Sequence, residues 1–156
     1  LFMASAHVAH DCRLGNQVVM ANNATLAGHV IVGDHVIFGG LSAVHQFVRV
    51  GAHAIISGMT GVRYDVIPFG AVVGDRGYLA GLNIVGMQRR GFSRDEIQAV
   101  RNAYQMLFKA ENGEFADRLA ATEARFSEVG PVREMLDFIR GQSARGITRP
   151  EAGEDE

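Results

Sequence analysis

An apolar residue recurs at every sixth position through the first 62 residues of this chain. The repeat runs through Phe2, Val8, Leu14, Met20, Leu26, Val32, Phe38, Val44, Val50, Ile56 and Val62. The next position along is mostly Ala, Gly or Ser, and the position four along is Ala, Cys, Val, Ser or Thr. This period fits neither an amphipathic helix nor one long strand. It predicts a parallel β-helix, in which three hexapeptides form one triangular coil of about 18 residues.

The change of pattern along the chain predicts two unequal parts. We expect a β-helix of roughly four coils over residues 1–74, and a glycine-rich irregular connection over residues 75–92. A capping box at Ser93-Arg94-Asp95-Glu96 opens an α-helical domain over residues 93–147, in which Pro131 begins the last helix. Residues 148–156 carry four acids and predict a disordered tail. Because the repeat is already in register at Phe2, we also expect further coils before it.

Composition excludes several classes of protein. The formal net charge of −2 argues against non-specific nucleic-acid binding. Cys12 is the only cysteine, so no disulfide can form within the chain, which favours a cytoplasmic location. The sequence has neither an apolar run of about 20 residues nor the basic start of a signal peptide, so we expect no membrane span.

Residues one coil apart are expected to stack in columns along the β-helix. The two columns at one corner are His10 with Gly28 and Gln46, and Asp11 with His29 and Phe47. A carboxylate beside an imidazole can hold one tautomer, as a general base requires, and the Gly28 N–H could meet a developing oxyanion. The alternative is that these polar residues only solvate the corner.

The remaining histidines admit other interpretations. His35 and His53 stack at a different corner, where a structural or subunit-contact role is favoured. His45 is either a packed corner histidine or a substrate contact. A zinc site like that of the β-helical carbonic anhydrases would need three convergent imidazoles. The spacing of the histidines here does not match that family, so we expect no metal.

Four motifs, taken in order along the chain, resemble one enzyme family. They are His7-Val-Ala-His-Asp-Cys12, Ala21-Asn-Asn-Ala-Thr-Leu-Ala-Gly-His29, Ala43-Val-His-Gln-Phe47 and Arg89-Arg-Gly-Phe-Ser-Arg94. They resemble the acyl-ACP:UDP-N-acetylglucosamine O-acyltransferases, which carry out the first acyl transfer of lipid A biosynthesis. The similarity extends from about residue 1 to the end of the helices, and it covers only the C-terminal part of that family's longer chain.

This resemblance implies a mainly β fold, a left-handed parallel β-helix followed by helices, assembled as a homotrimer with active sites between subunits. It implies that His10 is the general base, that Asp11 orients it and that the Gly28 N–H stabilises the tetrahedral intermediate. Gly58 would form the floor of the acyl channel, which favours a longer 3-hydroxyacyl chain. The contacts to UDP-N-acetylglucosamine would fall on His7, His29, His45, Gln46, Asn83, Arg89 and Arg90. Arg94 and Arg101, with Arg89 and Arg90, would meet acyl carrier protein, unless they simply solvate a helix face. No cofactor is implied.

Two other functions remain open from the sequence. One is UDP-3-O-acylglucosamine N-acyltransferase activity, because one base could serve a 3-hydroxyl or a 3-amino acceptor. The other is a non-catalytic trimeric β-helix scaffold.

Overall fold

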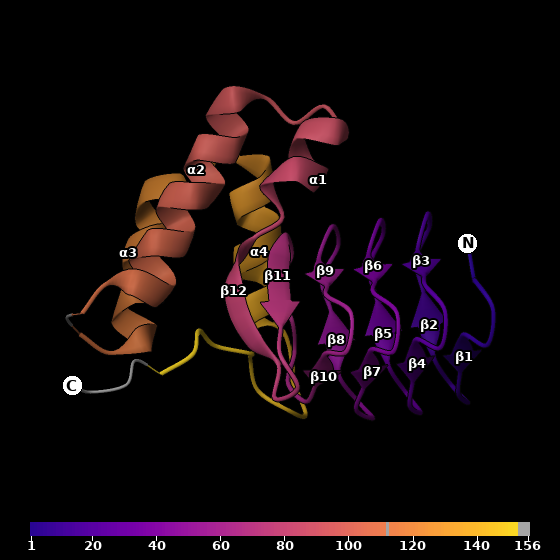
Figure 1. The fold of residues 1–156 in the computed structure, drawn as a ribbon. Coiled ribbons are helices and arrows are strands. Elements are labelled where there is room, and N and C mark those ends of the chain that lie inside the picture. The colour runs from indigo at the N-terminus through magenta and orange to yellow at the C-terminus, as the bar shows by residue number, and fades with distance from the viewer. Residues whose placement is uncertain (112, 153–156) are drawn as a thin grey trace. The chain divides into compact units, whose positions relative to one another are not determined.

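A computed structural model describes residues 1–111 and 113–152 of the chain. Residues 1–73 wind into a left-handed parallel β-helix, as the repeat and the resemblance predict (Figure 1). Through the first three coils the strands of each face pair in parallel, and the paired residues lie 18 apart, such as His7 with Thr25. The coil length inferred from the repeat is therefore confirmed.

The three faces are built from short strands. The first face has the order β1 (His7–Val8), β4 (Thr25–Leu26), β7 (Ala43–Val44) and β10 (Gly61–Val62). The second contains β2 (Arg13–Leu14), β5 (Ile31–Val32) and β8 (Arg49–Val50). The third contains β3 (Val19–Met20), β6 (Ile37–Phe38), β9 (Ile55–Ile56), β11 (Gly70–Val73) and β12 (Tyr78–Leu82). We call the corner between the first and second faces the first corner, and the corners that follow along the coil the second and third.

Two side chains of each hexapeptide point into the β-helix and form its core. From the second coil on, the repeat residues of the strands are buried, and so are the small residues four positions later. Phe2, in the first coil, is 55% exposed, because a described coil packs against only one side of its own coil. Burial of these apolar side chains is the main stabilising contribution to the stack.

The corners are made by residues with left-handed backbone geometry. The second residue of each turn has φ between 57° and 64°, and Asp11, His29 and Phe47 are three such residues. This conformation costs an L-residue roughly 1–2 kcal/mol. Its recurrence every six residues gives equivalent corners the same backbone course in successive coils, so their side chains form columns.

The chain departs from the repeat after Val62. The first corner of the fourth coil is two residues shorter, since Val66 rather than residue 68 bridges Val50. The expected irregular connection over residues 75–92 is instead largely regular. It contains β12, which pairs antiparallel with β11, and helix α1 (Ile84–Arg89). Gly74 and Gly77 lie in the hairpin turn between these strands, whereas Gly81 lies within β12 and Gly86 within α1.

Residues 84–141 form a separate helical unit. After α1 it contains α2 (Arg94–Tyr104), a π-helical segment η1 (Gln105–Lys109), α3 (Phe115–Phe126) and α4 (Gly130–Arg140). The predicted capping box at Ser93 is present in both directions, and Pro131 lies in the first turn of α4. Burial raises the pKa of Tyr104 on α2. None of the helices in the described residues combines the length and apolar character needed to span a bilayer.

The segment that follows α4 belongs to the β-helical unit. Ile147 bridges Asp65, and the Thr148 N–H donates to the Asp65 carbonyl at 2.7 Å. The expected helical domain therefore ends earlier than residue 147, and residues 148–149 are bonded rather than part of a disordered tail. Residues 153–156 of that expected tail lie outside the described residues.

Candidate active site

The two predicted columns are present at the first corner. The His29 N–H donates to the His10 carbonyl at 3.0 Å, and the Phe47 N–H donates to the Gly28 carbonyl at 3.1 Å. The rings of His29 and Phe47 stack with centroids 4.7 Å apart and an angle of 14° between their planes. The backbone ladder thus brings His10, Asp11, Gly28 and His29 together.

His10 and Asp11 form a hydrogen-bonded pair. The His10 Nδ1 lies 2.9 Å from Asp11 Oδ2, and His29 Nε2 lies 3.8 Å from the same oxygen. When Asp11 is ionised, this contact requires a proton on Nδ1, so a neutral His10 ring has its lone pair on Nε2. The His10 side chain is 73% exposed, so Nε2 can be reached by a ligand. The pKa of Asp11 lies below 3.8, the ordinary value for an aspartate. The largest cause is the hydrogen bond from His10, and the next is the charge of His29.

Gly28 lets the His10 ring lie against the backbone of the next coil. A β-carbon added at Gly28 would lie 2.7 Å from both Cε1 and Nε2 of His10, which is closer than such atoms can approach. No described residue accepts a hydrogen bond from the Gly28 N–H. The arrangement can therefore place a base nitrogen and a backbone donor beside the same reacting group.

The same trio meets the loosest requirement for a metal site. One possible ligand atom from each of His10, Asp11 and His29 lies within 4.8 Å of the others, and all three residues are exposed. A zinc ion requires lone pairs converging at about 2.0–2.2 Å. The Nδ1 of His10 is instead engaged with Asp11, so the observed geometry favours the acid–base arrangement.

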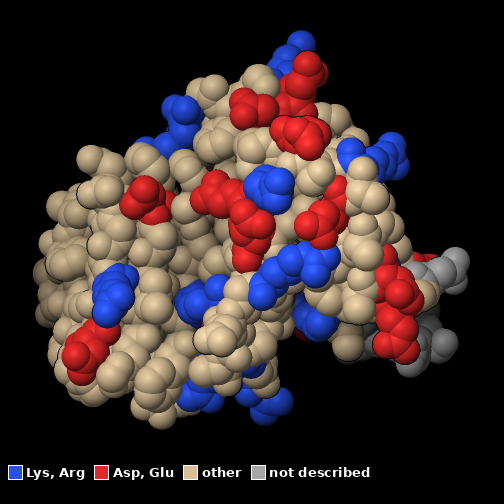
Figure 2. All heavy atoms as spheres, turned by 180° about the vertical axis from the view of Figure 1, so that it is seen from behind, with Lys and Arg blue, Asp and Glu red and all other residues tan. Residues whose placement is uncertain are grey.

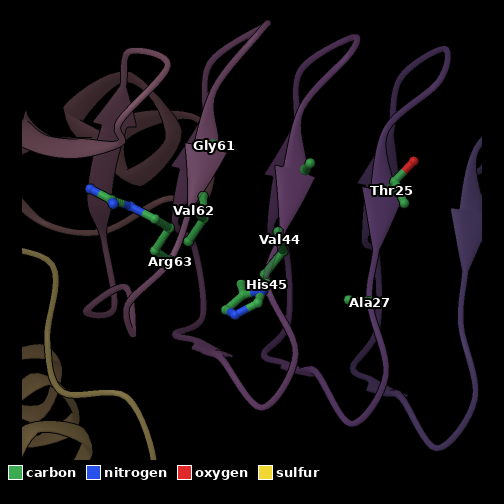
Figure 3. Close-up of a pocket in the computed structure, with 8 residues that line it drawn as sticks. Thr25, Ala27, Val44, His45, Gly61, Val62 and Arg63 are labelled. Carbon is green, nitrogen blue, oxygen red and sulfur yellow. The ribbon is translucent and has the colours of Figure 1, made fainter.

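Two more of the predicted contact residues lie on the first face. His7, on β1, and His45, which follows β7, are both exposed. His45 lines a shallow groove of about 340 Å³ on this face, and Figure 3 shows its lining residues coming from successive coils. The groove is lined by Thr25, Ala27, Ala43, Val44, His45, Gly61, Val62 and Arg63. Its lining is mostly apolar and small, which suits an extended apolar group.

Gln46 completes the His10 column, and its carbonyl has an unexpected partner. The regular ladder would place the N–H of residue 65 on this carbonyl. In the structure the Arg145 Nε donates to it at 3.0 Å, and the Asp65 N–H donates to Gly146 instead. No local pattern in the sequence indicates this role of Arg145, because Arg145 lies 99 positions farther along the chain than Gln46.

The other predicted residues lie away from the first corner. The side chain of Asn83 donates to the His53 carbonyl at 2.9 Å, at the second corner. Gly58 is exposed at the third corner, where an added β-carbon would lie 3.3 Å from the Gly40 carbonyl. Arg89, Arg90, Arg94 and Arg101 are exposed in the helical unit. The β-helical unit of one chain therefore does not bring Asn83 and Gly58 to the His10 corner.

The predicted second histidine stack is also present. The rings of His35 and His53 stack with centroids 4.9 Å apart, and Phe69 extends the stack beyond His53 at 5.4 Å. These parallel ring contacts lie at the second corner and support packing of successive coils.

A family model described as UDP N-acetylglucosamine O-acyltransferase, domain 2, matches residues 65–148, more than half of the chain. An acyl-[acyl-carrier-protein]–UDP-N-acetylglucosamine O-acyltransferase from Sinorhizobium fredii is 50% identical over 153 residues, which are 98% of this chain and 56% of that protein. The Paracoccus denitrificans protein of the same name is 54% identical over 151 residues, or 96% of this chain and 56% of its own. The chain thus spans about half the length of these relatives.

Solved structures show the same similarity. The UDP-N-acetylglucosamine acyltransferase of Arabidopsis superposes with a TM-score of 0.90 at 39% identity, over 93% of this chain and 53% of that one. The LpxA structure from Acinetobacter baumannii gives a TM-score of 0.88 at 36% identity, over 95% and 57% of the two chains.

Proposed function

Because this chain belongs to the UDP-N-acetylglucosamine O-acyltransferase family, we propose that it transfers a 3-hydroxyacyl chain from acyl carrier protein to the 3-hydroxyl of UDP-N-acetylglucosamine. The observation that carries this proposal is the His10–Asp11 pair beside Gly28, with the 2.9 Å contact that leaves Nε2 of His10 available as a base. The proposal includes the cytoplasmic location that the single cysteine favours and the homotrimer that the resemblance implies.

In the proposed reaction His10 Nε2 removes the proton of the sugar 3-hydroxyl as its oxygen attacks the thioester carbonyl. Asp11 holds the ring and stabilises the imidazolium that forms. The Gly28 N–H donates to the oxyanion of the tetrahedral intermediate. When the C–S bond breaks, the imidazolium returns its proton to the departing thiolate, so the protein is regenerated. The half-buried position of Cys12, whose Sγ donates to the Ala27 carbonyl at 3.0 Å, supports a route without an acyl-cysteine.

The remaining predicted residues serve binding in this proposal. His7, His29, His45 and Gln46 contact the nucleotide sugar from the first corner and first face. Asn83 contacts it from the second corner of a neighbouring subunit, because one chain holds Asn83 at a different corner from His10. Arg89 and Arg90 bind the diphosphate, for which the planar guanidinium is suited. Arg94 and Arg101 contact the acidic carrier protein.

The test is acyl transfer by the His10→Ala protein. General-base catalysis contributes about 10²- to 10⁴-fold, so we expect transfer to fall by that factor while circular dichroism and the oligomeric state stay unchanged. Near-normal turnover in a folded His10→Ala protein would contradict the assignment. Product mass spectrometry with 3-hydroxyl and 3-amino acceptors then separates O-acylation from N-acylation.

A further inference from the structure

A second groove lies at the first corner of the fourth coil, where the repeat is broken. It has a volume of about 490 Å³ and lies one coil beyond Gln46. Its lining comes from the shortened corner, the β11–β12 turn with the start of β12, and the segment after α4. The residues are Arg63, Tyr64, Arg76, Gly77, Tyr78, Arg145, Gly146, Ile147 and Arg149.

Hydrogen bonds hold these three segments together. The Thr148 hydroxyl donates to the Tyr64 carbonyl at 3.1 Å, and the Leu79 N–H donates to the Arg149 carbonyl at 2.9 Å. Beneath the corner, fully buried Asp65 accepts from the Arg49 side chain at 2.9 Å. These hydrogen bonds therefore hold in place the backbone that carries the arginines.

The groove is strongly basic. Four of its nine lining residues are arginines, and none of the nine is acidic. The β-helical coils are otherwise poor in charge. Only eight of the chain's 32 charged residues (15 basic plus 17 acidic) fall within residues 1–83, and two of those eight are Arg63 and Arg76 of the groove. Figure 2 likewise shows few charged side chains over the stacked coils on the face it presents. Four arginines that line one groove give it a positive potential, which favours the binding of an anion.

The chemistry of the lining points to a phosphate ester. Guanidinium groups bind phosphate oxygens through paired hydrogen bonds. Tyr64 and Tyr78 add ring surface for an organic portion, and Arg63 Cζ lies 5.6 Å from the Tyr64 ring centroid. Arg145, which lines the groove, also donates a hydrogen bond to the carbonyl of Gln46 in the His10 column. At roughly 4.8 Å a coil, the groove is about 14 Å from His10 along the axis, three coils away.

We propose that this arginine groove, formed by Arg63, Arg76, Arg145 and Arg149 with Tyr64, binds the phosphate of a small organic phosphate ester. Two sources have this chemistry: the diphosphate of a nucleotide and the phosphate of a phosphopantetheine arm. The site is separate from the base at His10, so it stands or falls independently of the proposed function.

Calorimetric titration with UDP, 4′-phosphopantetheine and phosphate-free pantetheine tests this proposal. We expect at least one phosphate ester to bind and pantetheine not to bind. The Arg63→Gln/Arg76→Gln protein should weaken that binding at least 10-fold, while Arg133→Gln, which removes an exposed arginine of α4, should not. Because UDP has a second proposed site at Arg89 and Arg90, only binding that the double variant weakens is assigned to the groove. Weakened binding of UDP assigns the nucleotide, and weakened binding of 4′-phosphopantetheine assigns the carrier arm.

The proposal is overturned if pantetheine binds as well as its phosphate ester, or if the double variant binds normally. It is also overturned if Arg133→Gln weakens binding as much, or if only an intact acidic protein binds. The same titration in His10→Ala separates the two hypotheses. Binding that persists there is independent of catalysis, whatever that variant does to acyl transfer.

Discussion

The His10 ring lies against Gly28 so closely that a β-carbon at position 28 would stand 2.7 Å from its Nε2 atom. The ring is an exposed side chain, so it can rotate away, whereas the backbone of Gly28 is fixed by the ladder to Phe47. The contact therefore concerns the placement of the base more than the stability of the fold.

The Gly28→Ala protein should consequently fold normally and lose activity. A misplacement of about 1 Å at a reacting group can cost about 100-fold, so we expect kcat to fall by that order while the melting temperature changes little. Steady-state kinetics and thermal unfolding measure the two effects. If the variant keeps wild-type kcat, the ring does not need its observed position.

The Asp11 carboxylate should titrate at higher pH once its partner is removed. Its pKa lies below 3.8 because of the His10 hydrogen bond and then the His29 charge, so His10→Ala should raise it toward 3.8. Because the folded-state pKa is lowered, ionised Asp11 stabilises the fold above about pH 3.8. That stabilisation is lost as the pH falls through the folded-state value. Carboxyl-carbon NMR measures the shift, with Arg133→Gln as the control. An unchanged titration in His10→Ala would show that the pair is not formed in solution.

The columns at the corners could be predicted because the spacing of 18 residues between stacked positions is constant through the first three coils. It places His10, Asp11, Gly28 and His29 together from sequence alone. The same 18-residue spacing places Arg63 in the column of His45, one coil farther along.

The fourth coil could not be predicted in the same way. Its first corner is shortened by two residues, and its missing ladder donor is replaced by the side chain of Arg145. Both features depend on a tertiary contact with the segment after α4, and a local repeat carries no information about such a contact. The β11–β12 hairpin could not be predicted for another reason: glycines favour a tight hairpin turn and an irregular loop alike.

Removing the buried carboxylate of Asp65 should destabilise this rebuilt coil. Asp65 is fully buried and accepts hydrogen bonds from the Arg49 backbone at 2.8 Å and the Arg49 Nε at 2.9 Å. Breaking one side of a buried pair costs about 3–5 kcal/mol, so Asp65→Ala should lower the free energy of unfolding by about 3 kcal/mol or more. The matched control is Glu123→Ala, which removes the exposed partner of Arg140 and should cost about 1 kcal/mol or less. Denaturant unfolding at fixed protein concentration compares them. Equal losses in the two variants would contradict this account.

A larger side chain at Gly58 should shorten the preferred acyl chain. The position is exposed at the third corner, and the neighbouring Gly40 carbonyl needs to give by only a few tenths of an ångström. Gly58→Met should therefore fold and fill the end of the proposed channel. Competition among 3-hydroxyacyl donors of several lengths measures the selectivity. Asn16→Met, at the equivalent turn position of the second corner, is the control. If neither variant changes the preferred length, the floor of the channel lies elsewhere.

Activity should be restored when two inactive subunits are mixed, if each active site combines the first corner of one chain with the second corner of another. His10 and Asn83 lie at these different corners, as the hydrogen bond from Asn83 to the His53 carbonyl shows. We expect His10→Ala and Asn83→Ala each to lose most activity alone. In randomly mixed trimers of a cyclic assembly, about a quarter of the sites would take an intact His10 from one chain and an intact Asn83 from its neighbour. Acyl transfer after unfolding and refolding the equimolar mixture should recover to about that level.

A mixture of His10→Ala with Gly28→Ala is the control, because these residues share one corner of one chain and no site would regain both. Absence of recovery in the test mixture would place the complete site within a single chain. Recovery in the control would show that His10 and Gly28 act from different chains and would contradict the proposed site.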